Sequence, residues 1–501
     1  MMRTAGAPDT GVEHAGAPPR RGAWFVSLFM LDMWERFSFY GMLAILFLYA
    51  VDSPEHGGLG MATGAASALV GTYLAAAFVA AMPGSWLGDR VLGTRRAALL
   101  GALGIVAGHT CLTLPATGTF YLGLILLACG TGLLKPNMTA LLGAFYGPGA
   151  DRGREAGFSV FYMSIQISAL AAPIVTGALG EGVDWHLGFG AAAVGMTFGI
   201  VCYLWGTRHF GAVGIAPADP ASSLVLAGVL RRAAVVTATV TALLAVDAAF
   251  GALRPQHVLG LVGLAVVIAP VLAFRTILRH PATTAAERAR VRGYLWVFGA
   301  AAVFWALFSQ STSVLSLFAK QFTDREVLGM TVPASWFQAL HPLFVLAGAP
   351  IAAALWPRLG RVGVSVKFAV GLTLAGAAYL VMALAALVSV GQAAPGWLVV
   401  TYLAQSAGEL ALAPIGLSVT AAIAPAAFTS QMMGVWWLSA ALGAAAGGQT
   451  ARLFSSMPAA SYFLLFGLVP IAVAVVLDAF RHGVDRALAP PSAVPVPCPS
   501  P

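Results

Sequence analysis

The sequence predicts an all-α integral membrane protein, and three observations support this fold class. Of its 501 residues, 59% are hydrophobic and only 9% are charged, whereas soluble domains carry about 25% charged residues. Apolar runs of about 20 residues, long enough to cross the core of a bilayer, recur from Trp24 to Phe480. Basic residues gather between alternate runs, as the positive-inside rule expects. We predict fourteen spans, near 24–50, 62–88, 96–115, 119–147, 155–180, 186–207, 233–253, 257–275, 293–319, 333–356, 365–390, 396–423, 430–452 and 461–480.

The distribution of the 27 Lys and Arg residues predicts the orientation of these spans. With the N-terminus inside the cell, 21 of them fall in cytoplasmic segments and two, Arg36 and Lys135, lie within spans. Such a bias places both termini in the cytoplasm and explains the net charge of +8 without a nucleic-acid partner. We expect a multi-pass protein of a bacterial-type inner (plasma) membrane. The four residues on the outer side are Arg254, Lys320, Arg325 and Arg452.

The order of apolar and polar segments predicts two six-helix bundles and two extra helices. Residues 23–208 hold the first six spans and residues 292–482 the last six, while the linker 209–291 holds the extra pair. Secondary transporters often consist of two six-helix halves of this kind. The ends, 1–22 and 483–501, are rich in Gly, Pro and Ala and are typical of disordered tails, here cytoplasmic.

The stretch "LDMWERFSFYG" places three ionisable groups in the first span. Asp32, Glu35, Arg36 and Tyr40 recur at three- and four-residue spacing and so share one face of a helix. Each ion at the bilayer centre costs about 2.5–3.5 kcal/mol on insertion scales, so these groups should face a cavity and find partners. Arg36 could bridge both acids in a static salt bridge. Alternatively, because two carboxylates exceed one guanidinium, one acid could take up a proton and couple transport to it.

Two further ions lie in the middle of spans. Lys135 stands in "GTGLLKPNMTALLG", before a proline expected to disturb the helix, and Glu409 stands in "AQSAGELALAPIGLS" of the second half. Simpler interpretations are a lysine that extends to the headgroups and a buried structural acid. A cation in one half and an anion in the other would instead suit a zwitterion, with its amine on Glu409 and its carboxylate on Lys135.

The segment "DMWERFSFYG" resembles the first-helix signature of the proton-dependent oligopeptide transporters, a branch of the major facilitator superfamily. The resemblance continues through "GDRVLGTRR", "GTGLLKPN" and "REAGFSVFYMSIQISALAAPIV". In the second half it includes "FWALFSQ", "WFQALHPLF", "GELALAPIGLS" and "MMGVWWLSAALG". It covers most of residues 24–480 and implies the major facilitator fold, with the two extra helices of bacterial members.

The resemblance also implies roles for matched positions. The matched residues that the resemblance assigns to proton coupling are Asp32, Glu35, Arg36 and Lys135. The superfamily loop after the second helix, of gating or structural importance, is formed by Gly88, Asp89 and Arg90. The expected substrate-binding residues are Tyr40, Lys135, Gln166, Trp305, Ser309, His341, Glu409 and Trp436.

Several of these positions depart from the family pattern. Asp32 replaces a glutamate, and Gln166 and His341 each replace an asparagine. Leu43 stands where the family has an arginine and Ser309 where it has a glutamate, which removes one charge of each sign. Lys135 then lacks its usual acidic partner, so it should pair with Glu35, a substrate carboxylate or water. The further substitution is Phe39, which replaces the first tyrosine of the signature.

Two consequences follow for the substrate site. Carboxylate recognition rests on Lys135 alone, so selectivity for free-ended dipeptides should be looser than is usual in the family. Histidine changes its charge between about pH 5 and 8, so His341 could contribute to coupling, although an uncharged, hydrogen-bonded histidine is the simpler expectation.

We therefore predict a monomeric symporter that takes up di- or tripeptides or peptide-like compounds by alternating access, with protons as the coupling ion and no other cofactor. The alternative is the same fold carrying a non-peptide metabolite or exporting a product. An enzyme is not expected, because no zincin motif, nucleophile elbow or phosphate loop occurs. The four cysteines show no metal-ligand spacing, so we expect no metal site.

Overall fold

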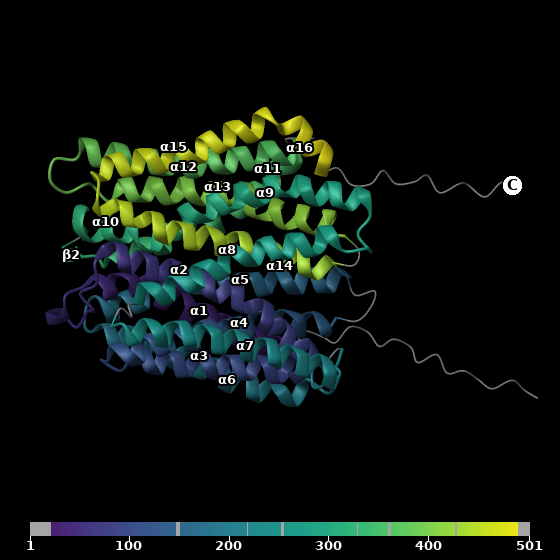
Figure 1. The fold of residues 1–501 in the computed structure, drawn as a ribbon. Helices are drawn as coiled ribbons and strands as arrows, with labels where there is room; N and C mark the ends of the chain where they lie inside the picture. Colours follow the sequence, from purple (N-terminus) through teal and green to yellow (C-terminus); the bar gives the residue numbers. More distant parts are fainter. Residues whose placement is uncertain are drawn as a thin grey trace, which may run out of the picture.

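The computed structural model describes residues 22–146, 151–217, 219–251, 255–327, 329–358, 362–425 and 428–488. These ranges are almost entirely helical, and long helices run side by side along one axis (Figure 1). Most of the two predicted tails lies outside the described residues. The C-terminal tail predicted from residue 483 is partly wrong, because a short helix, α16 (Arg481–Leu488), covers its beginning.

The first half consists of six long helices, purple to blue in the lower part of Figure 1. α1 packs against α5 and α6, and α3 packs against α4 and α6. The side chain of Asp184 accepts hydrogen bonds from the first amides of α6 and so caps that helix. The bounds are α1 (Ala23–Val51), η1 (Pro54–His56), α2 (Thr63–Leu87), η2 (Gly88–Leu92), α3 (Thr94–Leu112), α4 (Thr117–Ala144), α5 (Asp151–Gly180), α6 (Trp185–Gly206) and η3 (Thr207–His209).

The second half, teal to yellow in Figure 1, contains the long helices from α9 onward and a short hairpin. Thr284 and Glu287 form a capping box that starts the first of them. The bounds are α9 (Ala285–Ser309), η4 (Gln310–Thr312), α10 (Val314–Phe322), β1 (Glu326–Val327), β2 (Met330–Thr331), η5 (Ala334–Ala339), α11 (Leu340–Arg358), α12 (Val364–Val388), α13 (Gly396–Ile423), α14 (Thr429–Thr450), η7 (Ala451–Ser455) and α15 (Ala459–Ala479).

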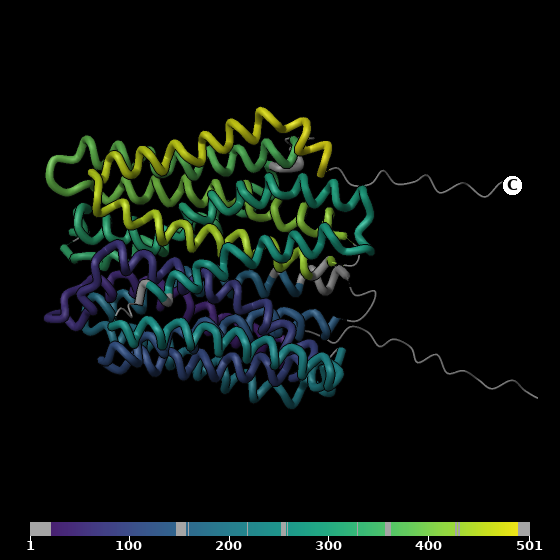
Figure 2. Tube along the Cα trace, in the orientation of Figure 1, coloured from purple at the N-terminus to yellow at the C-terminus, as the bar shows by residue number. Residues whose placement is uncertain are grey.

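Two extra helices, α7 (Ser223–Ala249) and α8 (Pro255–Arg279), connect the halves. Figure 2 shows both as teal tubes, α8 between the halves and α7 over the blue helices. α8 packs against α2 and α14, whereas no residue of α7 is buried. α7 begins ten residues before the predicted span, because Ser222 caps it, so Arg231 and Arg232 lie within a helix and not in a connector.

Eleven helices in the described residues are long and apolar enough to cross a membrane. They coincide with eleven of the fourteen predicted spans, and the other three predicted spans coincide with α1, α3 and α14. α1 has 29 residues, but any long window in it includes charges among Asp32, Glu35 and Arg36. The ions of α1 therefore explain why this helix, one of the three outside the set, fails a simple apolar criterion.

The two halves touch along α2 and α14, where small residues permit close approach. A Cβ at Gly71 of α2 would lie 2.5 Å from the carbonyl oxygen of Ala444 in α14, so this crossing requires glycine. Phe78 and Trp437 stack further along the same pair, with ring centroids 5.9 Å apart. The crossing holds the halves together beside the site described below.

Polar contacts between the halves gather at one end. We call the end where α16 lies the proximal end and the opposite end, where α10 and the hairpin lie, the distal end (Figure 1). At the distal end Asp52 pairs with Lys320 at 3.2 Å, and Gln338 donates to the carbonyl of Ala44 at 3.1 Å. Trp336 also donates to a carbonyl of α5. The halves are thus fastened at the distal end.

Candidate functional site

The predicted ions of α1 and α4 meet in one buried cluster. Lys135 Nζ lies 2.8 Å from Asp32 Oδ1 and 3.9 Å from Glu35 Oε2. Both carboxyl groups are fully buried, whereas the lysine side chain keeps 29% of its exposure. Lys135 therefore bonds within the protein and does not extend to the headgroups. α4 continues through Pro136, so the proline does not interrupt the helix that holds the lysine.

Arg36 forms a separate pair within the cluster. Its guanidinium donates to both carboxylate oxygens of Glu35 and lies over the ring of Phe39, 4.7 Å from the centroid. The expectation that Arg36 bridges both acids is wrong, because Asp32 is bound by Lys135 and by Ser164 instead. The two acids thus have different cations as their partners.

Ser164 of α5 completes the cluster, and sequence reasoning missed it. Its hydroxyl lies 2.5 Å from Asp32 Oδ2 and 2.6 Å from the carbonyl oxygen of Phe161. Ser168, four residues later, donates to the carbonyl of Met33 at 2.6 Å. The four-residue spacing of these serines in "YMSIQISAL" was the available signal, because it places both hydroxyls on one face of a helix.

The second half contributes Glu409 of α13 and His341 at the start of α11. His341 Nε2 lies 2.9 Å from Glu409 Oε2, although the angle is not that of a hydrogen bond. The imidazole ring packs edge-on against Phe308, with centroids 5.0 Å apart. The side chains of His341 and Glu409 retain 14% and 17% of their exposure, so the pair lines the site without being sealed in it.

Two tyrosines of the first half belong to the same region, and the guanidinium of Arg36 lies 6.0 Å from the ring centroid of Tyr40. Tyr40 of α1 and Tyr162 of α5 are within electrostatic reach of Glu409 across the halves. Gln166, a predicted binding residue, donates to the hydroxyl of Tyr162 at 3.0 Å. Tyr162 is 52% exposed and was not predicted, because a single tyrosine in an apolar span carries no distinguishing pattern.

The remaining predicted binding residues pack against other side chains or bond the backbone. Trp305 packs edge-on against Phe308, and its buried indole nitrogen has no hydrogen-bond partner among the residues that the structure describes. Trp436 is 1% exposed and packs on Gly416, so it is not brought against the ions. Ser309 donates to the carbonyl of Ala306, and Leu43 is buried in the apolar core. Neither Leu43 nor Ser309 offers a charge to Lys135.

Gly88, Asp89 and Arg90 do not form a loop, which corrects the sequence expectation. They lie in a π-helical turn, Gly88–Leu92, that continues α2. A Cβ on Gly88 would overlap the side chain of Asn137, which donates to the carbonyl of Gly84 at 2.9 Å. Arg90 pairs with Asp219 at 2.8 Å and so anchors the connector that leads to α7. The motif is a joint between α2, α4 and this connector.

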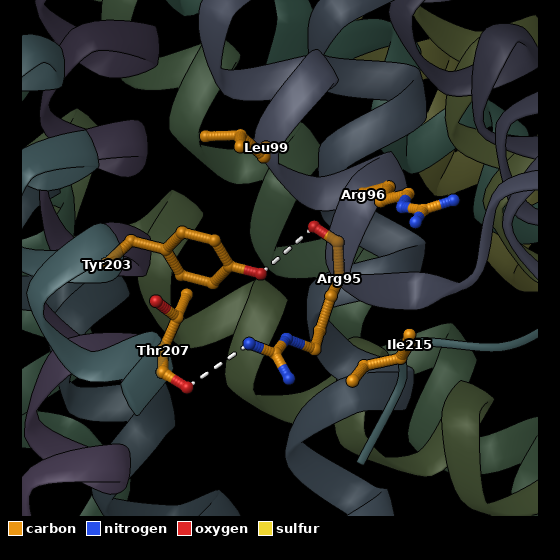
Figure 3. A pocket seen from close by; sticks show the side chains of 6 residues that line it. All are labelled: Arg95, Arg96, Leu99, Tyr203, Thr207 and Ile215. Carbon is orange, nitrogen blue, oxygen red and sulfur yellow. Dashed lines mark hydrogen bonds between the residues drawn. The ribbon is translucent and has the colours of Figure 1, made fainter. Parts of the chain in front are cut away.

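Figure 3 shows a different hollow, between α3, α6 and the connector. Arg95 donates to the carbonyl of Thr207 at 3.1 Å, and its own carbonyl accepts from Tyr203 at 3.0 Å (Figure 3). It also donates to the carbonyl of Gly211 at 2.8 Å. The guanidinium also lies 5.3 Å from the ring of Phe210. Because Arg95 is occupied by backbone carbonyls, this hollow is a structural joint of the first half and not part of the ionic site.

The ionic site has a simple charge balance. With all four groups ionised, Asp32 and Glu35 are neutralised by Arg36 and Lys135, and Glu409 contributes the remaining negative charge. A cationic group fits beside Glu409, and an anionic group can bind Lys135 only if it competes with Asp32. In the described residues, no group of three His, Cys, Asp or Glu side chains is arranged to hold a metal ion.

The sequence and the fold were compared with known proteins. The family model of the POT family matches residues 95–465. The chain is similar to an uncharacterized transporter of Bacillus subtilis (strain 168), YclF, with 36% identity over 467 residues, which cover 92% of this chain and 94% of that protein. It is similar to a di-/tripeptide transporter of Lactococcus lactis subsp. cremoris, with 34% identity over 473 residues, 90% of this chain and 93% of that one.

The fold gives the same result. A crystal structure of a peptide transporter POT in complex with sulfate superposes with a TM-score of 0.90 at 37% sequence identity. The match covers 94% of this chain and 97% of the solved one. The two-bundle architecture with two extra helices, expected from the sequence, therefore agrees with the fold of solved POT peptide transporters.

Proposed function

The chain belongs to the POT family, and on that premise we propose that it is a proton-coupled symporter that takes up di- or tripeptides or peptide-like compounds. The family resemblance predicted from the sequence is confirmed, as is a multi-pass transporter fold in a membrane. The proposal of proton-coupled peptide uptake depends on one observation. Lys135 is bound to buried acids of the first half, while Glu409, in the second half, keeps partial exposure.

The two ends of a peptide fit these two groups. The ammonium group of the substrate binds Glu409 and displaces His341 from it. The substrate carboxylate binds Lys135, because neither Leu43 nor Ser309 supplies another cation. Tyr40, Tyr162 and Gln166 lie between the two ends, where their polar atoms can bond the peptide group.

Proton coupling follows from competition for Lys135. In the structure the ammonium group of Lys135 is paired with Asp32 at 2.8 Å. A proton on Asp32 removes the carboxylate charge and frees Lys135 for the substrate carboxylate. Substrate and proton then neutralise the site together, and the halves can rearrange about it without an isolated charge in the low-dielectric interior.

The alternative function, a non-peptide cargo or an exported product on the same fold, has no support from the relatives. One of them is named a di-/tripeptide transporter, and the solved neighbour is described as a peptide transporter. Competition by dialanine against a labelled peptide distinguishes the two cases, because a metabolite carrier or an exporter should ignore dialanine.

The decisive experiment is uptake of labelled dialanine into proteoliposomes with an imposed proton gradient. We expect gradient-driven uptake by the native protein and its loss, by at least about tenfold, in Glu35→Gln, Lys135→Ala and Glu409→Ala. The first two changes leave a buried ion without its partner, and the third removes the carboxylate proposed to receive the ammonium group of the substrate. Arg452→Ala, at the distal end and away from the site, is the control. Undiminished uptake in Glu35→Gln and Lys135→Ala would contradict the coupling scheme.

A further inference from the structure

We propose that Ser164 is a positioning residue that sets the pH at which the transporter couples to protons. Its hydroxyl can hydrogen-bond Asp32 both when the acid is ionised and when it is protonated. The inference rests on the proposed function and adds to it a residue of α5. It is carried by the geometry of one hydroxyl group between two acceptors.

The hydroxyl of Ser164 has two acceptors and one hydrogen. Its oxygen lies 2.5 Å from Asp32 Oδ2 and 2.6 Å from the carbonyl oxygen of Phe161. A hydroxyl carries one donor and two acceptor lone pairs, so it can donate to only one of these oxygens at a time. Both Ser164 and Asp32 are fully buried, so bulk water does not replace the missing bond.

Protonation of Asp32 determines which of the two oxygens accepts the hydrogen bond from Ser164. When Asp32 is ionised, Ser164 donates to Oδ2, while Lys135 binds Oδ1. When a proton enters on Oδ2, the acid becomes the donor and Ser164 the acceptor, and the serine hydrogen rotates to the carbonyl of Phe161. No bond other than the O–H of the acid forms, and Lys135 is left free to bind the substrate carboxylate.

The charged groups that face Asp32 come from α1 and α4. On α1 the neighbours are Glu35 and Arg36, which pair with each other, and on α4 the neighbour is Lys135. Tyr73 of α2 is within electrostatic reach of Glu35. From α6, glycines pack on Trp34 and offer no charge, and from α5 Ser164 makes the contact. Of the polar partners bonded to Asp32, Ser164 is the one whose role can reverse from donor to acceptor.

The direction of its effect can be derived. A hydrogen bond to an ionised acceptor is stronger than one between neutral groups, so Ser164 favours the ionised form of Asp32 over the protonated form. Removal of the hydroxyl should make protonation easier. The pH profile of transport should then move to higher pH, by about one unit.

The test uses the full-length protein in proteoliposomes. Uptake of labelled dialanine, driven by an inside-negative potential at equal pH on both sides, is measured from about pH 5 to pH 8. Ser164→Ala should move the midpoint of the profile upward by about one pH unit, and Ser164→Thr, which keeps a hydroxyl, should restore it. An unchanged midpoint in Ser164→Ala, with the native protein active, would overturn the role of Ser164 and leave the proposed function intact.

Ser168→Ala is the matched control. Ser168 is on the same face of α5, is equally buried and also bonds α1, but its acceptor is the carbonyl of Met33, which does not titrate. If the effect of Ser164 were only the attachment of α5 to α1, both alanine variants would lower the rate and neither would move the midpoint. That outcome overturns the proposal, whereas a shift confined to Ser164→Ala supports it.

Discussion

His341 is the residue that most changes the chemistry of the substrate site. It stands 2.9 Å from Glu409, on the group that would receive the ammonium of a substrate. The ammonium group of a substrate can readily displace a neutral imidazole from Glu409. An imidazolium instead forms an ion pair with Glu409 and competes with the substrate. Because histidine changes its charge between about pH 5 and 8, this competition should grow as the pH falls.

We therefore expect His341→Asn to strengthen dialanine binding at acidic pH and to leave it nearly unchanged at alkaline pH. The gain should reach about fivefold near pH 5.5, which corresponds to an ion pair of about 1 kcal/mol. The measurement is the concentration of dialanine that halves binding of a labelled peptide at several pH values. The same comparison in Glu409→Gln is the control, because without the carboxylate the histidine has nothing to occupy. Equal pH dependence in native and His341→Asn protein would exclude this competition.

The sequence predicted which residues form the site better than it predicted their partners. Asp32, Glu35, Arg36 and Lys135 were identifiable because ions in apolar spans are costly and therefore conspicuous. The bond from Lys135 to Asp32 was not, because it joins residues 103 positions apart in the sequence. Local spacing favoured Arg36 as the partner of both acids, and tertiary packing decided otherwise.

At the level of elements, α5 connects the ionic site with the distal contact between the halves. Ser164 bonds Asp32, Ser168 bonds Met33, and Thr176 donates to the carbonyl of Gly41 at 3.0 Å. Just past the end of the helix, the carboxylate of Glu181 accepts from the amides of Ala334 and Ser335, each at 2.9 Å. Glu181 thus caps η5 of the opposite half, and it can do so only while the distal end is closed.

Glu181→Ala should shift the conformational equilibrium toward a distal-open state. The change removes two backbone bonds and one serine bond to a carboxylate, and a lost cap of this type costs about 1–2 kcal/mol, or roughly tenfold in the equilibrium. The measurement is the rate at which a membrane-impermeant thiol reagent labels a cysteine placed at Ala339, a buried residue of η5, in a variant whose native cysteines are replaced.

Asp184→Ala is the matched control for this prediction. Asp184 also caps a helix at the distal end, but that helix is α6 of its own half, and the carboxylate bonds the amide of His186 at 2.8 Å. Its loss should lower the stability of the first half without exposing the cysteine. If both variants labelled equally fast, the cap on η5 would be an ordinary stabilising contact and not a latch.

The helices themselves were largely predictable, but their interruptions were not. Hydropathy placed α12 and α13 within two residues of their observed bounds, because long apolar runs between polar turns leave little choice. The span predicted over 293–319 is instead α9, the short turn η4 and α10. There Gln310 accepts hydrogen bonds from Tyr379 and Tyr462, so a polar core of the second half breaks the helix. A hydropathy window does not register such long-range bonds.

At the level of the whole molecule, the proposed alternating-access mechanism makes this structure one end of the transport cycle. The halves are fastened at the distal end by Asp52 with Lys320 and by Glu181 with η5. Lys135 and Glu409 keep 29% and 17% of their side-chain exposure, so the site is not sealed while the distal end is closed, and we infer that it is reached from the proximal end. If the basic segments are cytoplasmic, as we propose from their distribution, this state faces the cytoplasm.

Completion of the cycle requires the distal contacts to separate while each half keeps its shape. Spin labels at Val183 and Met330 report on this motion, because both side chains are exposed at the distal end and they belong to different halves. Their distance should increase by several ångströms when dialanine is added at acidic pH to a variant whose native cysteines are replaced. The pair Val183 and Leu114, both exposed at the distal end of the first half, should stay constant and so exclude local loop motion. A shift in both pairs would mean that the first half deforms internally. No shift in either pair, with uptake intact, would mean that the halves do not separate at this end, and rocking about the ionic site would have to be abandoned as the mechanism.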